Sequence, residues 1–256
     1  MDILAIHNSP ETIAARTTAV RDGAMAGSAR LQRGQFGAMR PEDVALLFGL
    51  YDREFFGGWL SDRTRQETGQ DVTFRVSGRM TRAGGKMMHR WRREPNGRKK
   101  YWYEIVIASR LLAMSFGPGV RPVKVCGLIC FDAMASLQRL MEHEIVHLAE
   151  FLAWGESRCG GKRFKVIAAR MFAHTDTKHE LVTAREQAAV EHNVSVGLWV
   201  RFDFQGRDLT GQVNRIHRRA TVLVEDARGA RYTDGKRYRK YYVPLNQLSP
   251  AAVTSR

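Results

Sequence analysis

Apolar residues recur at helical spacing in three parts of the chain, and each run carries signals that begin or end a helix. The first run begins at Pro41, and Gly57-Gly58 stops it. The second covers 133–154, with Asp132 as its predicted N-cap and Gly155 as its end. The third follows a loop, and its apolar positions form one stripe: Phe164, Ile167, Ala168, Met171 and Phe172.

Alternation of apolar with polar residues predicts strands elsewhere. Residues 72–76 form one short run of this kind. A hairpin is predicted next, with arms over 86–93 and 101–107 around the turn signal at 95–97. After a short polar helix near 184–191, alternation returns in several short runs over about 55 residues, which is typical of a small barrel.

These patterns predict the α+β fold class and five segments. Residues 1–38 read as a poorly ordered leader, because small and polar residues dominate and apolar periodicity is weak. Residues 39–180 read as one domain, with a long helix and a β-hairpin or small sheet. Residues 181–194 are expected to form a linker helix, 195–249 a small, basic, all-β SH3-like barrel, and 250–256 a tail.

Composition narrows the class of protein. Of the 256 residues 44% are hydrophobic, and no run approaches the roughly 18 apolar residues that span a bilayer. The start of the chain lacks the apolar segment of a secretory signal. The three cysteines, Cys126, Cys130 and Cys159, do not make a disulfide framework, and each reads by default as a buried apolar side chain. We therefore expect a soluble protein with no membrane partner, in the bacterial cytoplasm or nucleoid, and the sequence leaves its oligomeric state open.

The net charge of +15 favours a polyanionic partner, and nucleic acid is the obvious one inside a cell. The alternative is a chain that is merely rich in Arg. Nine basic residues and one acidic residue lie between Arg79 and Lys100, among several aromatic residues. Cations can follow phosphates while aromatic faces stack on unpaired bases. The candidates for contact with DNA or RNA are Arg82, Lys86, Arg90, Trp91, Arg92, Arg93, Lys99 and Lys100. The alternative is a solvated hairpin whose aromatic side chains pack into the core.

The predicted barrel is basic as well, with twelve Lys and Arg against five Asp and Glu from Ser195 to Arg256. The candidates there for nucleic-acid contact are Arg218, Arg219, Lys236 and Arg237. Small barrels also serve as internal supports or as modules that dock a substrate, so these roles remain open.

The most specific motif is His143-Glu144-Ile145-Val146-His147 in the second helical run. Histidines four residues apart lie on one helix face and can share a zinc ion. Zinc lowers the pKa of a bound water towards about 7, and Glu144 can accept that proton and return it to a leaving amine. The alternative is a helix with two surface histidines, but the apolar residues around the motif argue against exposure.

A catalytic zinc needs a third protein ligand. The candidates are Glu150, Glu156, Cys159, His174 and His179. Cys159 lies in the loop that is expected to fold back over the metal, and a thiolate suits zinc. We therefore favour Cys159, with a core cysteine as the alternative.

Four segments resemble the SprT/Spartan family of zinc metallopeptidases, in order and spacing, over roughly residues 41–175. They are Leu46–Leu60, Val76–Gly85, Glu104–Leu112 and Glu142–His147. The resemblance implies a compact zincin-like α+β domain and peptidase chemistry with one zinc per chain. Eukaryotic relatives cleave proteins crosslinked to DNA, which implies a nucleic-acid-associated protein substrate and a role in DNA repair only by analogy.

The chain departs from the family at the third ligand. The family has a His, followed by Gly, two further residues and Phe, and here Gly160 occupies the His position in Cys159–Phe164. Either Cys159 takes its place from one residue earlier, or the site holds only two histidines. The prediction is a zinc peptidase acting at or near nucleic acid. One alternative is a non-enzymatic nucleic-acid-binding protein with a structural or degenerate zinc site, and another is a zinc hydrolase for small amides.

Overall fold

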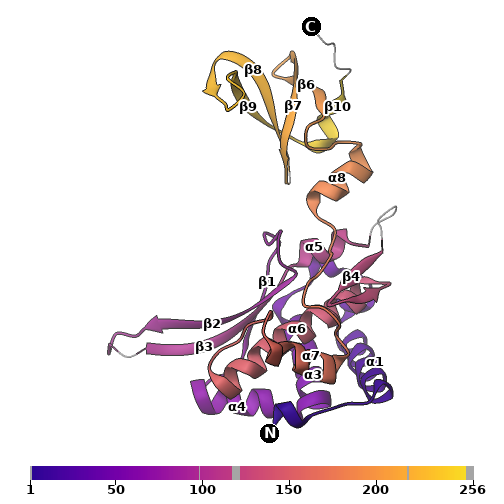
Figure 1. Ribbon diagram of the computed structural model, residues 1–256, viewed down its shortest axis with the longest axis vertical. Coiled ribbons are helices and arrows are strands. Elements are labelled where there is room, and N and C mark those ends of the chain that lie inside the picture. Colours follow the sequence, from indigo (N-terminus) through magenta and orange to yellow (C-terminus); the bar gives the residue numbers. More distant parts are fainter. Residues whose placement is uncertain (1, 98, 117–121, 218, 252–256) are drawn as a thin grey trace. The chain divides into compact units, whose positions relative to one another are not determined.

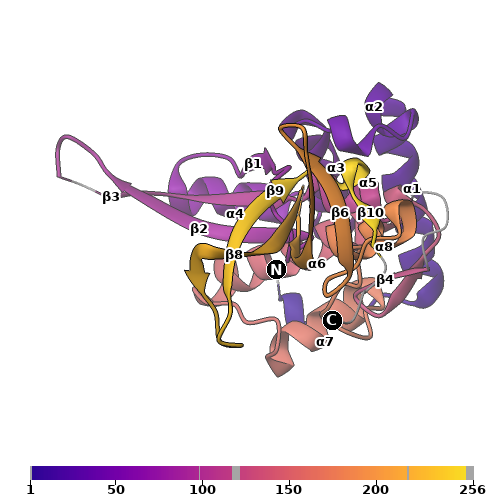
Figure 2. The same cartoon turned by 90° about the horizontal axis from the view of Figure 1, so that it is seen from above.

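The chain has a mixed α+β fold in two compact units, the first extending to Leu181 and the second beginning at Val182. Figures 1 and 2 show the computed structural model, which describes residues 2–97, 99–116, 122–217 and 219–251. Among these residues no helix is both long enough and apolar enough to cross a bilayer.

Helices form the larger part of the first unit. Those predicted are confirmed as α3 (Pro41–Phe56), α6 (Ala133–Trp154) and α7 (Lys162–Phe172), whereas α4 (Trp59–Thr68) and α5 (Ser109–Met114) were not predicted. The Asp132 carboxylate caps α6 by accepting from the Ala135 amide at 2.7 Å, and Gly155 ends this helix with φ +72°.

A three-stranded sheet packs on α6. It comprises β1 (Thr73–Val76), β2 (Gly85–Arg93) and β3 (Lys99–Ile107), in the order β1-β3-β2. Strand β1 is parallel to β3 and β2 is antiparallel to it, which confirms the predicted hairpin. Strand β2 approaches α6 closely at Gly84 and Gly85, where an added Cβ would lie 2.5 Å from Leu140 and 2.6 Å from the Glu144 carboxylate. A smaller hairpin joins β4 (Val123–Val125) to β5 (Leu128–Cys130).

The expectation of a poorly ordered leader over 1–38 is wrong. This segment contains η1 (Ile3–Ala5), α1 (Pro10–Gly27), α2 (Ala29–Gln32) and η2 (Phe36–Ala38), and α1 packs on α3. The small residues that suggested disorder allow this packing. A Cβ at Gly23 would lie 2.9 Å from Leu50, and one at Gly27 would lie 2.8 Å from Leu46.

The second unit contains α8 (Ala184–His192), where a helix is predicted, followed by a five-stranded antiparallel sheet. The strands are β6 (Trp199–Phe204), β7 (Arg207–Ile216), β8 (Ala220–Arg231), β9 (Arg237–Val243) and β10 (Ser249–Pro250), and η3 (Leu245–Gln247) precedes β10. Their order is β10-β6-β7-β8-β9, and among the described strands none joins β9 to β10. The five described strands therefore form an open sheet and no closed barrel, so the small SH3-like barrel expected over 195–249 is not confirmed. Strand β10 is only two residues long, and its Pro250 has no amide hydrogen to donate.

The packing of α1 makes a testable prediction about stability. Val20 is fully buried, whereas its neighbour Ala19 is exposed. We expect Val20→Asp to lower the free energy of unfolding by about 3 kcal/mol or more, because a carboxylate would be buried without a partner. Ala19→Asp, the control, should change it by no more than about 0.5 kcal/mol. Urea denaturation of the full chain measures both, and equal midpoints for the two variants would contradict the packing.

Candidate metal centre

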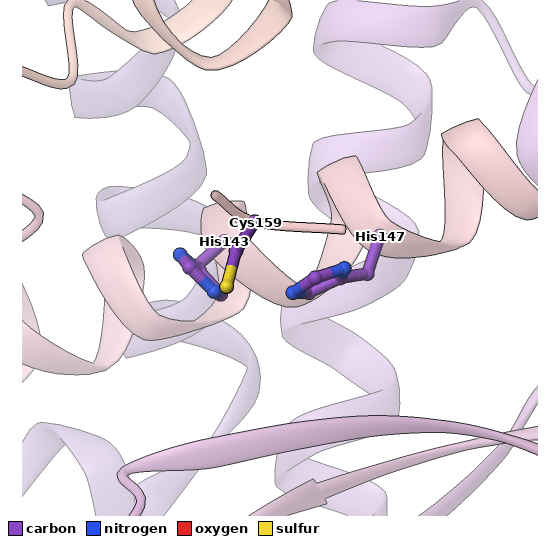
Figure 3. Close-up of side chains that lie close together, drawn as sticks. All are labelled: His143, His147 and Cys159. Carbon is purple, nitrogen blue, oxygen red and sulfur yellow. The ribbon is translucent and has the colours of Figure 1, made fainter. Parts of the chain in front are cut away.

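Three side chains in the first unit converge on one point (Figure 3). His143 and His147 project from the same face of α6, and Cys159 comes from the loop between α6 and α7. One ligand atom from each residue lies within 4.8 Å of the other two. Ligand atoms around a tetrahedral zinc lie about 3.5 Å apart, which is close to the separation of these donors. The group can hold a metal ion, and its two imidazoles and one thiol suit zinc.

The loop that carries Cys159 is fixed by the buried carboxylate of Glu150, which is only 1% exposed. One carboxylate oxygen accepts from the Ser157 hydroxyl at 2.6 Å and from the Arg158 amide at 3.3 Å. The other accepts from the Arg163 guanidinium at 2.8 Å. Glu150 therefore ties both sides of Cys159 to α6.

Ser157 also fixes the orientation and tautomer of His147. The Ser157 hydroxyl lies 2.6 Å from Nδ1 of His147, and it donates its single hydrogen to Glu150. Nδ1 must then be the donor in its contact with Ser157, since that hydroxyl has no second hydrogen. Nε2 of His147 is left with a free lone pair, as a metal ligand requires.

His143 has a weaker partner of the same kind. Its Nδ1 lies 3.7 Å from the sulfur of Cys126, whose thiol contacts the Arg139 carbonyl at 3.8 Å. The ring of Phe164 lies 4.8 Å from the His143 ring and 4.6 Å from the His147 ring. Burial lowers the pKa of His143 to about 3 and also lowers the pKa of His147. Both imidazoles are therefore neutral at pH 7, the form that binds metals.

Glu144 faces strand β2. Its carboxylate accepts from the Met87 amide at 2.6 Å and lies against Gly85. Burial raises its pKa to about 8, against the opposing effects of the Met87 amide and of Lys86. The metal-free protein therefore keeps Glu144 largely protonated at neutral pH. Glu144 directly follows His143 in the sequence.

The other candidates for third ligand have different partners. Glu150 binds the loop, as described, and the Glu156 side chain is 81% exposed beside Arg163. His174 contacts the buried Glu142 at 2.7 Å, and His179 accepts from the Gly84 amide at 2.8 Å. Among the described residues, only Cys159 joins the two histidines in a group that can hold a metal ion.

The predicted nucleic-acid residues of the hairpin divide between its two faces. On one face Arg90 pairs with Glu104 at 2.8 Å, and Arg92 and Lys100 line a small pocket beside Trp102. Trp91 is 55% exposed, with Lys99 over its ring at 4.6 Å. Three further candidates, Arg82, Lys86 and Arg93, are exposed.

Part of the aromatic set packs inward, as the alternative reading of the hairpin holds. Tyr103 is buried, its ring stacks on His89 at 4.9 Å, and His89 lies 6.0 Å from Phe151 of α6.

The predicted basic residues of the second unit do not form one patch. Lys236 pairs with Glu225 at 2.9 Å, and Arg237 donates to the Gly229 carbonyl at 3.1 Å. Arg219 is exposed beside the turn between β7 and β8, and Arg218 lies outside the described residues.

Sequence reasoning missed the partners of the candidate ligands: Ser157, Cys126 and the Met87 amide. Glu150 was a candidate ligand, but it instead holds the loop that carries Cys159. Its place three residues after His147 put it on the ligand face, and this spacing is the one signal that pointed to it.

Searches of protein-family models, of curated proteins and of solved structures find no match to this chain.

The role of Ser157 is testable through metal affinity. Ser157→Ala removes the hydroxyl that accepts the His147 Nδ1 hydrogen and donates to Glu150. The His147 ring and the Glu150 carboxylate are then less well oriented. We expect zinc affinity to fall about 10- to 100-fold, the usual effect of losing such a partner. Competition with a chromophoric chelator measures this, with the exposed Ser195→Ala of the second unit as control. Equal affinities for the two variants would contradict the role.

The pKa of Glu144 predicts a pH dependence of stability. In the metal-free folded protein this pKa is about 8, above its ordinary value of 4.5. The folded state therefore holds a proton that the unfolded state releases, so the contribution of Glu144 to stability falls as pH rises from about 5 to 8, by at most about 1.4 kcal/mol per pH unit. Glu144→Gln removes this dependence, while the histidines contribute equally to both proteins. Denaturation in EDTA should show the variant gaining stability on the wild type as pH rises, and a constant difference would refute the assignment.

Proposed function

We propose that the chain is a zinc-dependent peptidase of SprT type, with its centre at His143, His147 and Cys159. The observation that carries the proposal is the convergence of these three side chains, two of them from the helix that also carries the buried Glu144. The resemblance of four segments to the SprT/Spartan family supports it. Cys159 stands one residue before the family's His position, and its side chain reaches the two histidines.

Zinc bound there supplies a Lewis acid and an activated water. The protein's own residues do the rest. Ser157 and Glu150 hold His147 in its ligating tautomer. A cation bound there would lower the pKa of Glu144, so that its carboxylate could accept a proton from the bound water and return it to the leaving amine. The Met87 amide holds one oxygen of Glu144 and leaves the other for this exchange.

One feature favours a polypeptide over a small amide as substrate. Among the described strands β2 pairs with β3 alone, so its outer edge, which meets Glu144 at the Met87 amide, has no strand partner. An unpaired edge suits an extended chain, which can add to it as a further strand. A separate cleft of about 530 Å³ follows the loop that carries Cys159, and its lining includes neither the candidate ligands nor Glu144.

The basic charge supports substrates that are held at nucleic acid. The net charge of +15 raises the concentration of polyanions around the molecule. Proteins bound or crosslinked to DNA are the substrate class that this charge and the family resemblance together favour.

The proposal predicts the zinc content and the cleavage activity of three variants. Wild-type protein should contain one zinc per chain, and Cys159→Ala should lose most of it. Cys130→Ala is the matched control, since Cys130 is buried outside the ligand group. Glu144→Gln should keep zinc and lose at least about 100-fold in cleavage rate, the usual contribution of a general base. Elemental analysis and digestion of a basic DNA-bound protein, with and without single-stranded DNA, measure these outcomes.

Each failure has a distinct meaning. Wild-type protein purified without zinc, and unable to take it up, would overturn the metal centre. If both wild type and Glu144→Gln retain zinc and neither cleaves the substrate, the protein would instead be a non-enzymatic nucleic-acid-binding protein with a structural zinc.

A further inference from the structure

A basic groove lies within the second unit, on the outer face of its sheet. Its volume is about 450 Å³, and it is formed by β7, β8, β9 and the turn between β7 and β8. The charged and aromatic side chains that line it are Arg215, His217, Arg219, Lys240 and Tyr242. Of the described residues that line the groove, none is acidic.

A β-bulge at Asn214 turns Arg215 towards the groove. Val213 and Ile216 are both buried although they are three residues apart, which regular alternation does not allow. The pairing passes from Val213 opposite Val222 to Arg215 opposite Thr221, so Asn214 is the extra residue. Arg215 therefore lies on the outer face, and the bulge accounts for its place there.

Strand β9 presents Tyr242 on the same outer face. Tyr242 pairs with Thr221, which pairs with Arg215, so the three residues form a row across three strands. Tyr241 packs on Phe202 at 5.6 Å and Val243 is buried, which anchors the strand on both sides of Tyr242. The Tyr242 side chain is 65% exposed and has an open ring face.

The groove cations differ from other cations of this sheet. Lys236 pairs with Glu225 at 2.9 Å, and Arg239 pairs with Asp226 at 3.1 Å. Within the described part of the chain, Arg215, Arg219 and Lys240 form no ion pair with a carboxylate, and Lys240 lies over the Tyr232 ring at 5.8 Å. Among the described residues, therefore, no carboxylate pairs with these three cations of the groove.

We propose that this groove binds single-stranded nucleic acid. One base stacks on Tyr242, and the adjoining phosphates contact Arg215, Arg219 and Lys240. An exposed aromatic face beside unpaired cations fits an unstacked base with its backbone, whereas the bases of a duplex are not available to stack. The groove lies wholly within the second unit, so this inference does not require the metal centre or peptidase activity.

Fluorescence anisotropy of the full chain with labelled dT15 and U15 tests the groove. Tyr242→Ala should raise Kd roughly tenfold for the strand that binds, the effect of losing one stacked base, and Tyr242→Phe should stay close to wild type. Arg215→Ala and Arg219→Ala should each raise Kd and reduce the slope of log K against log salt by about 0.7. Arg239→Ala is the matched control, because it removes one charge from strand β9 outside the groove. It should change Kd less than twofold.

Ultraviolet crosslinking of bromodeoxyuridine-substituted DNA, mapped by mass spectrometry, locates the bound strand independently. A crosslink in β9 supports the groove, and tighter binding of U15 or of dT15 assigns it to RNA or to DNA. Crosslinks confined to 85–107, with Tyr242→Ala unchanged, would overturn the proposal. Equal losses of affinity for Arg239→Ala and Arg215→Ala would also overturn it. So would a duplex that binds more tightly than either single strand and whose Kd does not change in Tyr242→Ala.

Discussion

Helix α6 buries three carboxylates, and the need to satisfy each of them ties the rest of the first unit to this helix. Glu142, Glu144 and Glu150 are 0%, 4% and 1% exposed. A buried carboxylate without hydrogen bonds is strongly unfavourable, so each has recruited partners from another part of the chain. Glu142 is met by Tyr51 of α3, by Arg139 and by His174, which follows α7. Glu144 is met by β2, and Glu150 by the loop that carries Cys159.

This arrangement gives the candidate metal centre its shape through contacts within the protein. His143 and His147 lie between the three carboxylates along α6, so the elements that satisfy the acids also surround the ligands. Helix α6, strand β2 and the loop are held by charged or polar contacts made in a largely apolar interior. Such contacts depend on direction as well as distance, and they set the orientation of the side chains.

Local signals in the sequence were sufficient for α3, α6, α7 and the β2–β3 hairpin, and for grouping His143 and His147 with Cys159. The Asp132 cap, the Gly155 stop and the four-residue spacing of His143 and His147 depend only on near neighbours, and the structure contains the predicted helix around them. Cys159 was favoured because loops after such helices fold back, and its sulfur does lie beside the histidines.

Long-range contacts could not be predicted in this way. The partners Tyr51 and Glu142 are 91 residues apart, and Met87 and Glu144 are 57 apart, so no local spacing connects them. Composition was misleading at the N-terminus, where Gly23 and Gly27 suggested disorder and instead allow two helices to touch. Among the described strands the sheet is open because β10 pairs with β6 and not with β9, and alternation alone does not reveal which strands pair.

The boundary between Leu181 and Val182 has a consequence for how this chain can evolve. All candidate metal ligands and their partners lie before it, and all residues of the groove lie after it. Each unit also has its own buried core. Each set of residues is positioned within its own unit, so the two halves can diverge, or be exchanged by recombination, as separate modules.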